Sequence, residues 1–140
     1  MGQAAEDTIE QPLLAGNAVR VGADGTVHLV GVQCAGCQTK VFPPVLVCPE
    51  CMSEDIDKID LSSDGSLYSW SVVHVAPKGW NVPYIAGYVD LPDDVRVFAH
   101  ITGADPGSLE MDMAVTLTTA VLGDKDGAAV ESYAFTPKQA

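Results

Sequence analysis

The stretch from Cys34 to Cys51 reads CAGCQTKVFPPVLVCPEC and holds all four cysteines of the chain, with the spacing C-x2-C-x10-C-x2-C. Two residues between paired cysteines let a tight turn aim both thiolates at one ion while backbone N–H groups bond the sulfurs. Two such turns supply the four soft ligands that Zn²⁺ prefers. The sequence therefore predicts a metal site made by Cys34, Cys37, Cys48 and Cys51, with zinc favoured over other ions.

Other interpretations of these cysteines compete with zinc. Two disulfides could use the four thiols, but the chain has the character of a cytosolic protein, and cytosolic thiols stay reduced. A thioredoxin-like redox site needs one pair in a βαβ setting, and here there are two pairs. Iron in a rubredoxin-like site would use the same four sulfurs, and only metal analysis separates it from zinc. Because four protein ligands leave no open position, the predicted role is a structural clasp.

The segments on either side of the cysteines have β character. Residues 19–21 and 27–32 carry regularly spaced valine and leucine around a glycine-containing turn at 22–25, which predicts a hairpin that leads into the first cysteine pair. Residues 52–65 are polar, and we interpret them as a connector that ends in a turn at Asp64-Gly65.

Five β-like runs follow the connector, separated by stretches rich in Pro, Gly and Asp. They are Ser66–Ala76, Tyr84–Leu91, Val95–Thr102, Met113–Leu122 and Val130–Thr136. Strict alternation in the first run would place Tyr68 and Trp70 on one face and Leu67 on the other. Five short strands predict a small closed barrel, of which the OB-fold is the common five-stranded form. Residues 103–112 have room for one helical turn at most.

The chain is thus predicted to be mainly β, with three parts. Residues 1–16 form a flexible or weakly helical lead-in, residues 17–61 the hairpin and zinc ribbon, and residues 62–140 the OB-fold barrel. The acidic N-terminus lacks the basic and apolar regions of a secretory signal, and no apolar run approaches the roughly 20 residues that span a bilayer. These features predict a cytoplasmic protein with no membrane partner.

Charge and motif content narrow the function classes. Seven basic residues stand against nineteen acidic ones, for a net charge of −12, which argues against nucleic-acid binding. This acidity suits either a partner with a basic surface or simple solubility. With the cysteines committed to metal, no thiol nucleophile remains, and motifs of serine hydrolases, zinc proteases and nucleotide-binding loops are missing. His28, His74 and His100 fall in three separate predicted strands, so the chain by itself is predicted not to be an enzyme.

Two loops carry candidate contact residues. Trp80 lies in a loop flanked by Gly and Pro, where it either contacts a partner or ligand or caps the end of the barrel, and Lys78 beside it could meet a phosphate. Phe42 and Pro43 lie between the cysteine pairs, where they either stiffen the loop or form an apolar tip that docks a partner.

The order of these motifs resembles a known family, the OB-fold proteins with a rubredoxin-like zinc ribbon that accompany thiolase-like acyl-CoA enzymes. The resemblance covers about residues 27–137 and is carried by CAGC…VFPPVLVCPEC, DGSLYSWSVVH, VPYIAGYVDLPDDVRVFAHITG and the closing YAFTP. The short N-terminus and the YAFTP ending are further similar to small subunits of benzoylsuccinyl-CoA-type thiolases. Val45 stands where many members have Arg, and Asp112 where many have Gly, so contacts made by those residues are not carried over.

The resemblance implies a non-catalytic subunit that binds a thiolase-like catalytic subunit in a heteromer and helps shape its CoA-thioester entrance. It implies a structural zinc ion, with the catalytic cysteine and histidines in the partner. On this view Phe42, Pro43, Lys78 and Trp80 are the candidate contacts to CoA or partner. Two other functions stay open, a nucleic-acid-binding zinc-ribbon OB-fold and a rubredoxin-like electron carrier.

Overall fold

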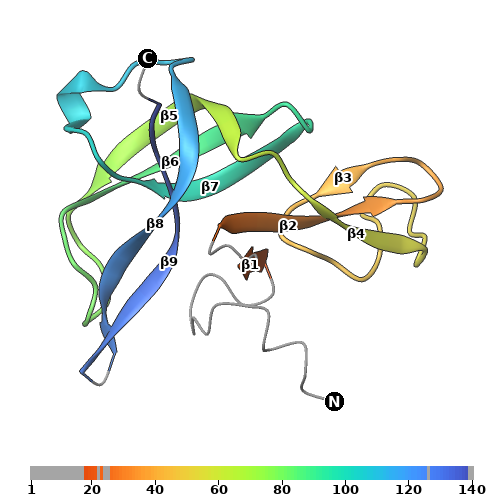
Figure 1. The fold of residues 1–140 in the computed structure, drawn as a ribbon, viewed down its shortest axis with the longest axis horizontal. Coiled ribbons are helices and arrows are strands. Elements are labelled where there is room, and N and C mark those ends of the chain that lie inside the picture. The colour runs from red at the N-terminus through yellow and green to blue at the C-terminus, as the bar shows by residue number, and fades with distance from the viewer. Residues whose placement is uncertain (1–17, 22, 24–25, 126, 139–140) are drawn as a thin grey trace.

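A computed structural model describes residues 18–21, 23, 26–125 and 127–138, so the predicted lead-in at 1–16 lies outside the described residues. A barrel and a small sheet lie side by side, and the chain passes from the sheet to the barrel between β4 and β5 (Figure 1). The strands are β1 (Val19–Val21), β2 (Val27–Cys34), β3 (Lys40–Val41), β4 (Ile56–Asp60), β5 (Asp64–Val73), β6 (Tyr84–Leu91), β7 (Val95–Ile101), β8 (Ala114–Lys125) and β9 (Ala128–Pro137).

The small sheet is built on β2. The predicted hairpin is present, because β1 pairs antiparallel with the first residues of β2, while β3 and β4 pair with its second half. The prediction of a simple connector after the cysteines was wrong, since β4 forms within it. Ile56 and Ile59 are three residues apart and give no alternating strand signal. Pairing with β2 nonetheless satisfies backbone groups that would otherwise be unpaired at that edge.

The five later strands close into a barrel in the order β5-β6-β7-β9-β8, which confirms the predicted fold class. All neighbours are antiparallel except β7 and β9, which pair in parallel. The predicted turn at Asp64-Gly65 was wrong, because both residues begin β5 and pair with β8. Gly65 is needed for close packing, since a Cβ there would lie 2.7 Å from the carbonyl oxygen of Asp90. The segment before β8 holds one short 3₁₀ turn, η3 (Pro106–Ser108), within the predicted limit.

A β-bulge changes which residues of β5 face the core. The pairing of β5 with β6 shifts register between Leu67 and Ser69. Leu67 is fully buried, and Trp70 packs against the same core, although strict alternation predicted opposite faces for them. A bulge adds one residue to a strand and so reverses the alternation beyond it.

One hydrophobic core runs through both parts of the molecule. Val19 and Leu29 of the small sheet, and Leu61 directly after β4, belong to the same cluster as Phe135 and the inward residues of the barrel. At the junction, the backbone N–H of Ser62 donates to a carboxylate oxygen of Asp93, at 3.0 Å. The zinc-ribbon part is therefore packed onto the barrel and does not hang from a linker. Among the described residues, no helix is long and apolar enough to cross a membrane.

Candidate metal centre and partner-contact surfaces

The two cysteine pairs sit in turns with the same backbone hydrogen bonds. In the first turn the N–H of Cys34 donates to the carbonyl of Thr39, and its carbonyl accepts from the N–H of Gln38, both at 2.9 Å. The second turn repeats both bonds at 2.9 Å, with Cys48, Ser53 and Met52 in the corresponding positions. Gln38 has φ 69° and Met52 has φ 67°, so each turn ends in a left-handed residue. This matched pair of turns, which the C-x2-C spacing predicts, brings the four sulfurs together at one point.

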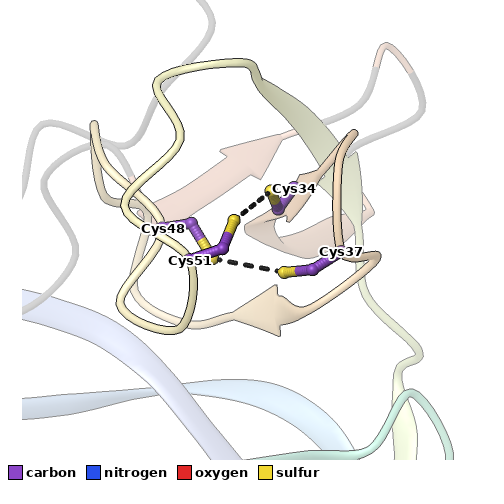
Figure 2. A group of neighbouring side chains, drawn as sticks. All are labelled: Cys34, Cys37, Cys48 and Cys51. Atoms are coloured by element: carbon purple, nitrogen blue, oxygen red, sulfur yellow. Dashed lines mark hydrogen bonds between the residues drawn. The ribbon is translucent and has the colours of Figure 1, made fainter.

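The four thiol groups form one cluster (Figure 2). Their sulfurs lie within 4.8 Å of one another, and the Cys34–Cys51 and Cys37–Cys48 sulfur pairs are each 3.5 Å apart. A tetrahedron of sulfurs about 2.3 Å from zinc has edges of about 3.8 Å, whereas a disulfide needs about 2.0 Å. The four side chains therefore fit a closed Zn²⁺ site, and they are free thiols rather than disulfides.

Hydrogen bonds around the cluster set the acidity of its thiols. The Thr39 hydroxyl lies 3.1 Å from the Cys37 sulfur, and with the Thr39 N–H it lowers the pKa of Cys37 to about 6. The N–H of Cys37 is the main cause of a lowered pKa at Cys34. At Cys51 the N–H of Ser53 acts most strongly and lowers the pKa, but the sulfurs of Cys34 and Cys37 outweigh it and raise the pKa to about 12. Four crowded thiolates repel one another, and a divalent cation removes that cost.

Trp80 belongs to a group of three neighbouring rings, in which His100 stacks on both Tyr84 and Trp80. The Tyr84 and His100 rings are 4.3 Å apart and inclined by 18°, and the Trp80 ring lies 5.8 Å from each. His100 is only 9% exposed, its Nε2 has no hydrogen-bond partner among the described residues, and burial lowers its pKa. Trp80 therefore covers the barrel wall over His100, although it stays partly exposed beside a 220 Å³ hollow that it shares with Lys78.

The loop that carries Trp80 is anchored to β8 by backbone contacts. The N–H of Asp124 donates to the carbonyl of Gly79 at 2.8 Å, and the N–H of Asn81 donates to the carbonyl of Leu122 at 2.9 Å. A Cβ at Gly123 would lie 2.0 Å from the Gly79 oxygen, so only glycine permits this approach. In Figure 1 the β5–β6 loop and the β8–β9 hairpin lie together, on the side of the barrel away from the small sheet.

Phe42 and Pro43, the other two candidate contact residues, lie apart from the β5–β6 loop that carries Trp80. Phe42 is half-buried and its ring meets that of Tyr133 edge to face, while Pro43 is exposed. The Tyr133 hydroxyl donates to the carbonyl of Phe98 at 3.0 Å, and burial raises the pKa of Tyr133. Phe42 thus joins the ribbon to the barrel, a contact that sequence reasoning missed. The outermost apolar side chain of its loop is Leu46, which is 87% exposed.

The histidines lie in three unlike places. His28 is part of β2 and half-buried, and His100 lies on β7 under Trp80. His74 was predicted inside a strand, but β5 ends at Val73 and His74 is exposed just beyond it.

Comparison with known proteins decides the family. A family model described as the ChsH2 rubredoxin-like zinc ribbon domain matches residues 27–57, and one described as the ChsH2 C-terminal OB-fold domain matches residues 58–120. This chain belongs to the ChsH2-type family of zinc-ribbon OB-fold proteins. The match assigns the four-cysteine cluster to a zinc ribbon and the five-stranded barrel to an OB-fold.

Relatives in this family carry names of enzyme subunits or of scaffold proteins. The chain is 40% identical over 115 residues to a benzoylsuccinyl-CoA thiolase subunit, BbsA, of Thauera aromatica, covering 81% of this chain and 79% of the relative. It is 34% identical to a DUF35 domain-containing scaffold protein of Methanocaldococcus jannaschii, covering 78% and 81%. A solved structure titled Ltp2-ChsH2(DUF35) aldolase matches with a TM-score of 0.65 and 31% identity, covering 79% of this chain and 84% of that one.

Proposed function

We propose that this chain is a non-catalytic subunit of a heteromeric thiolase-type complex that acts on acyl-CoA thioesters. The observation that carries the proposal is its 40% identity to a subunit of a benzoylsuccinyl-CoA thiolase, over most of both chains. In this proposal the chain stabilises the catalytic subunit and shapes the entrance for the CoA thioester. The catalytic cysteine and histidines belong to the partner.

The chemistry of the chain supports an accessory role. Its four thiols converge on one cluster, where a metal ion would take all of them and leave none as a nucleophile. A closed tetrahedral ion has no position for substrate. The free thiols are compatible with a complex that works in the reducing cytoplasm.

Co-expression with the thiolase-like chain of the same organism tests the proposal. We expect one complex on size-exclusion chromatography, containing both chains and zinc, that cleaves a β-ketoacyl-CoA thioester in the presence of free CoA. Benzoylsuccinyl-CoA is the first substrate to assay. Full thiolysis by the catalytic chain alone, with no co-purification of this chain, would overturn the proposal.

The aldolase match favours a second candidate for the partner. A thiolase transfers the acyl group to free CoA, whereas a retro-aldol cleavage releases a carbonyl product and consumes no thiol. Omission of free CoA from the assay therefore separates the two partners. Activity that persists without CoA identifies an aldolase-type partner.

Lys78 and Trp80 are our candidates for contact with the thioester, because Lys78 is exposed, Trp80 is partly exposed, and both line the 220 Å³ hollow. The ammonium of Lys78 is suited to a CoA phosphate. We expect Lys78→Ala to raise KM for the thioester several-fold and leave complex formation unchanged, with Lys58→Ala on β4 as the charge-matched control. Equal KM values for the two variants would show that Lys78 does not contact the thioester.

A further inference from the structure

Four side chains form an exposed patch across β5, β6 and β7 of the barrel, which we call the aromatic strip: Tyr68, Tyr88, Arg96 and Phe98. Tyr68 is 42% exposed, Tyr88 43% and Phe98 55%, large fractions for aromatic rings on neighbouring strands. Tyr88 and Phe98 are direct cross-strand partners with ring centroids 5.1 Å apart. The guanidinium carbon of Arg96 lies 3.7 Å from the centre of the Tyr68 ring.

An ion pair within the chain fixes the Arg96 side chain of the aromatic strip without a partner. Arg96 donates from Nε and Nη2 to both carboxylate oxygens of Asp90, at 2.6 and 3.1 Å, and the two residues are cross-strand partners. Two pairs beyond Tyr88 and Phe98 along the same two strands lie Ala86 and His100, where the Trp80 ring covers His100. Rigid rings and a clamped guanidinium lose little conformational entropy on binding.

The composition of the strip matches the centre of a protein interface. Tyr, Phe and Arg are enriched in such centres, while Lys and Glu are depleted, and truncation of a few central residues removes most of the affinity. Asp90 balances the one cation of the strip, so a matching partner surface is neutral and apolar.

Charge argues against a nucleic acid on this surface. Strands two and three of an OB barrel are the usual oligonucleotide face, and stacked rings suit bases. However, the only cation of the strip is already paired with Asp90, and the chain carries a net charge of −12. Phosphates would be repelled rather than neutralised.

We propose that the aromatic strip is the surface on which the catalytic acyl-CoA subunit docks. The inference rests on the proposed function, because a relative 40% identical is itself one subunit of a thiolase and its partner must cover part of the surface. The strip is the part of the barrel whose exposed rings, local neutrality and prior order fit such a partner.

Docking is measured by titrating the purified catalytic subunit with the zinc-loaded chain, using calorimetry or surface plasmon resonance. We expect the double variant Tyr88→Ala/Phe98→Ala to raise Kd by about 30-fold or more, the effect of losing central interface residues. Zinc content and thermal midpoint are measured for each variant, so that unfolding is not mistaken for lost docking. Phe98→Tyr keeps the ring and is expected to bind within about threefold of the parent.

Two controls make the result specific. Met111→Ala changes a 65% exposed residue outside the strip, and Leu46→Ala changes an 87% exposed apolar side chain of the loop between the cysteine pairs. Both are expected to bind like the parent. Unchanged affinity of the double variant would contradict the proposal that the aromatic strip is the docking surface. Loss of binding in Leu46→Ala alone would contradict it as well.

The binding experiments distinguish failure of the proposed function from failure of the docking surface, and they also detect a different partner on the aromatic strip. If the parent chain forms no complex with the catalytic subunit, the proposed function fails and the docking surface fails with it. If the parent chain forms the complex and the double variant binds the catalytic subunit with the same affinity, the aromatic strip is not the docking surface, and the proposed function still stands. A homodimer that the double variant dissociates, or salt-sensitive binding of an oligothymidylate that it abolishes, would assign the strip to a second copy or to a nucleic acid and overturn the proposal.

Discussion

The ring of Phe42 meets the ring of Tyr133 edge to face, with centroids 5.9 Å apart and planes at 90°. Phe42 comes from the loop between the cysteine pairs and Tyr133 from the last strand of the barrel, so this contact ties the zinc ribbon to the barrel. Of the two roles considered for Phe42, stiffening of its loop or docking of a partner, neither included this contact within the chain.

Phe42→Ala is expected to lower the free energy of unfolding by about 1–3 kcal/mol, because it removes a half-buried ring from a packed junction. Zinc should remain bound, since the four sulfurs lie on other residues. Urea unfolding measures the change, and Leu46→Ala, at an 87% exposed position of the same loop, is the control with an expected change within about 0.5 kcal/mol. Equal effects of the two substitutions would show that the Phe42 contact contributes nothing.

Thr39→Val is expected to weaken zinc binding by about tenfold, because it removes the hydroxyl that supports the Cys37 sulfur at 3.1 Å. Competition with a chromophoric chelator measures the affinity. Ser53→Ala is the matched control: Ser53 holds the same position in the second turn, but its hydroxyl accepts from the N–H of Asp55. An equal loss in both variants would contradict a specific hydroxyl–sulfur contact. The parent protein should be colourless, with one zinc and no iron.

Gly123→Ala is expected to displace the Trp80 loop and cost about 1–3 kcal/mol, because the new Cβ would lie 2.0 Å from the Gly79 oxygen. A shift in tryptophan fluorescence and a lower unfolding midpoint check this. Gly107→Ala is the control, since a Cβ there meets nothing within 4 Å. Unchanged fluorescence and stability in Gly123→Ala would show that the loop does not depend on this contact.

Stability is expected to fall as pH drops from about 7 to 5. Burial lowers the pKa of His100 below 6.5, so in this window the unfolded chain binds a proton that the folded chain does not. His100→Phe should flatten the dependence of the urea midpoint on pH in this range. Asp64 titrates in a separate window: Thr116 and Lys138 lower its pKa, so its contribution is lost only as pH falls below about 3.8. Parallel pH profiles for the parent and His100→Phe would contradict the assignment.

Much of the architecture was predictable because its signals are local. The C-x2-C spacing predicts converging thiols, and the Tyr84–Leu91 run has the same bounds as β6. β4 escaped prediction because Ile56 and Ile59 do not alternate, and its strand state depends on pairing with β2. The faces of Leu67 and Trp70 were wrong because a bulge depends on the partner strand.

The sequence by itself determined the cysteine cluster, the β content and the acidic charge, since turn chemistry, alternation and composition act over a few residues. Only the tertiary structure decided that Tyr88 lies opposite Phe98, that Arg96 lies over Tyr68, and that Phe42 meets a ring from the far end of the chain. These contacts depend on strand register and on closure of the barrel. Packing of the whole chain selects that register, and no short segment contains it.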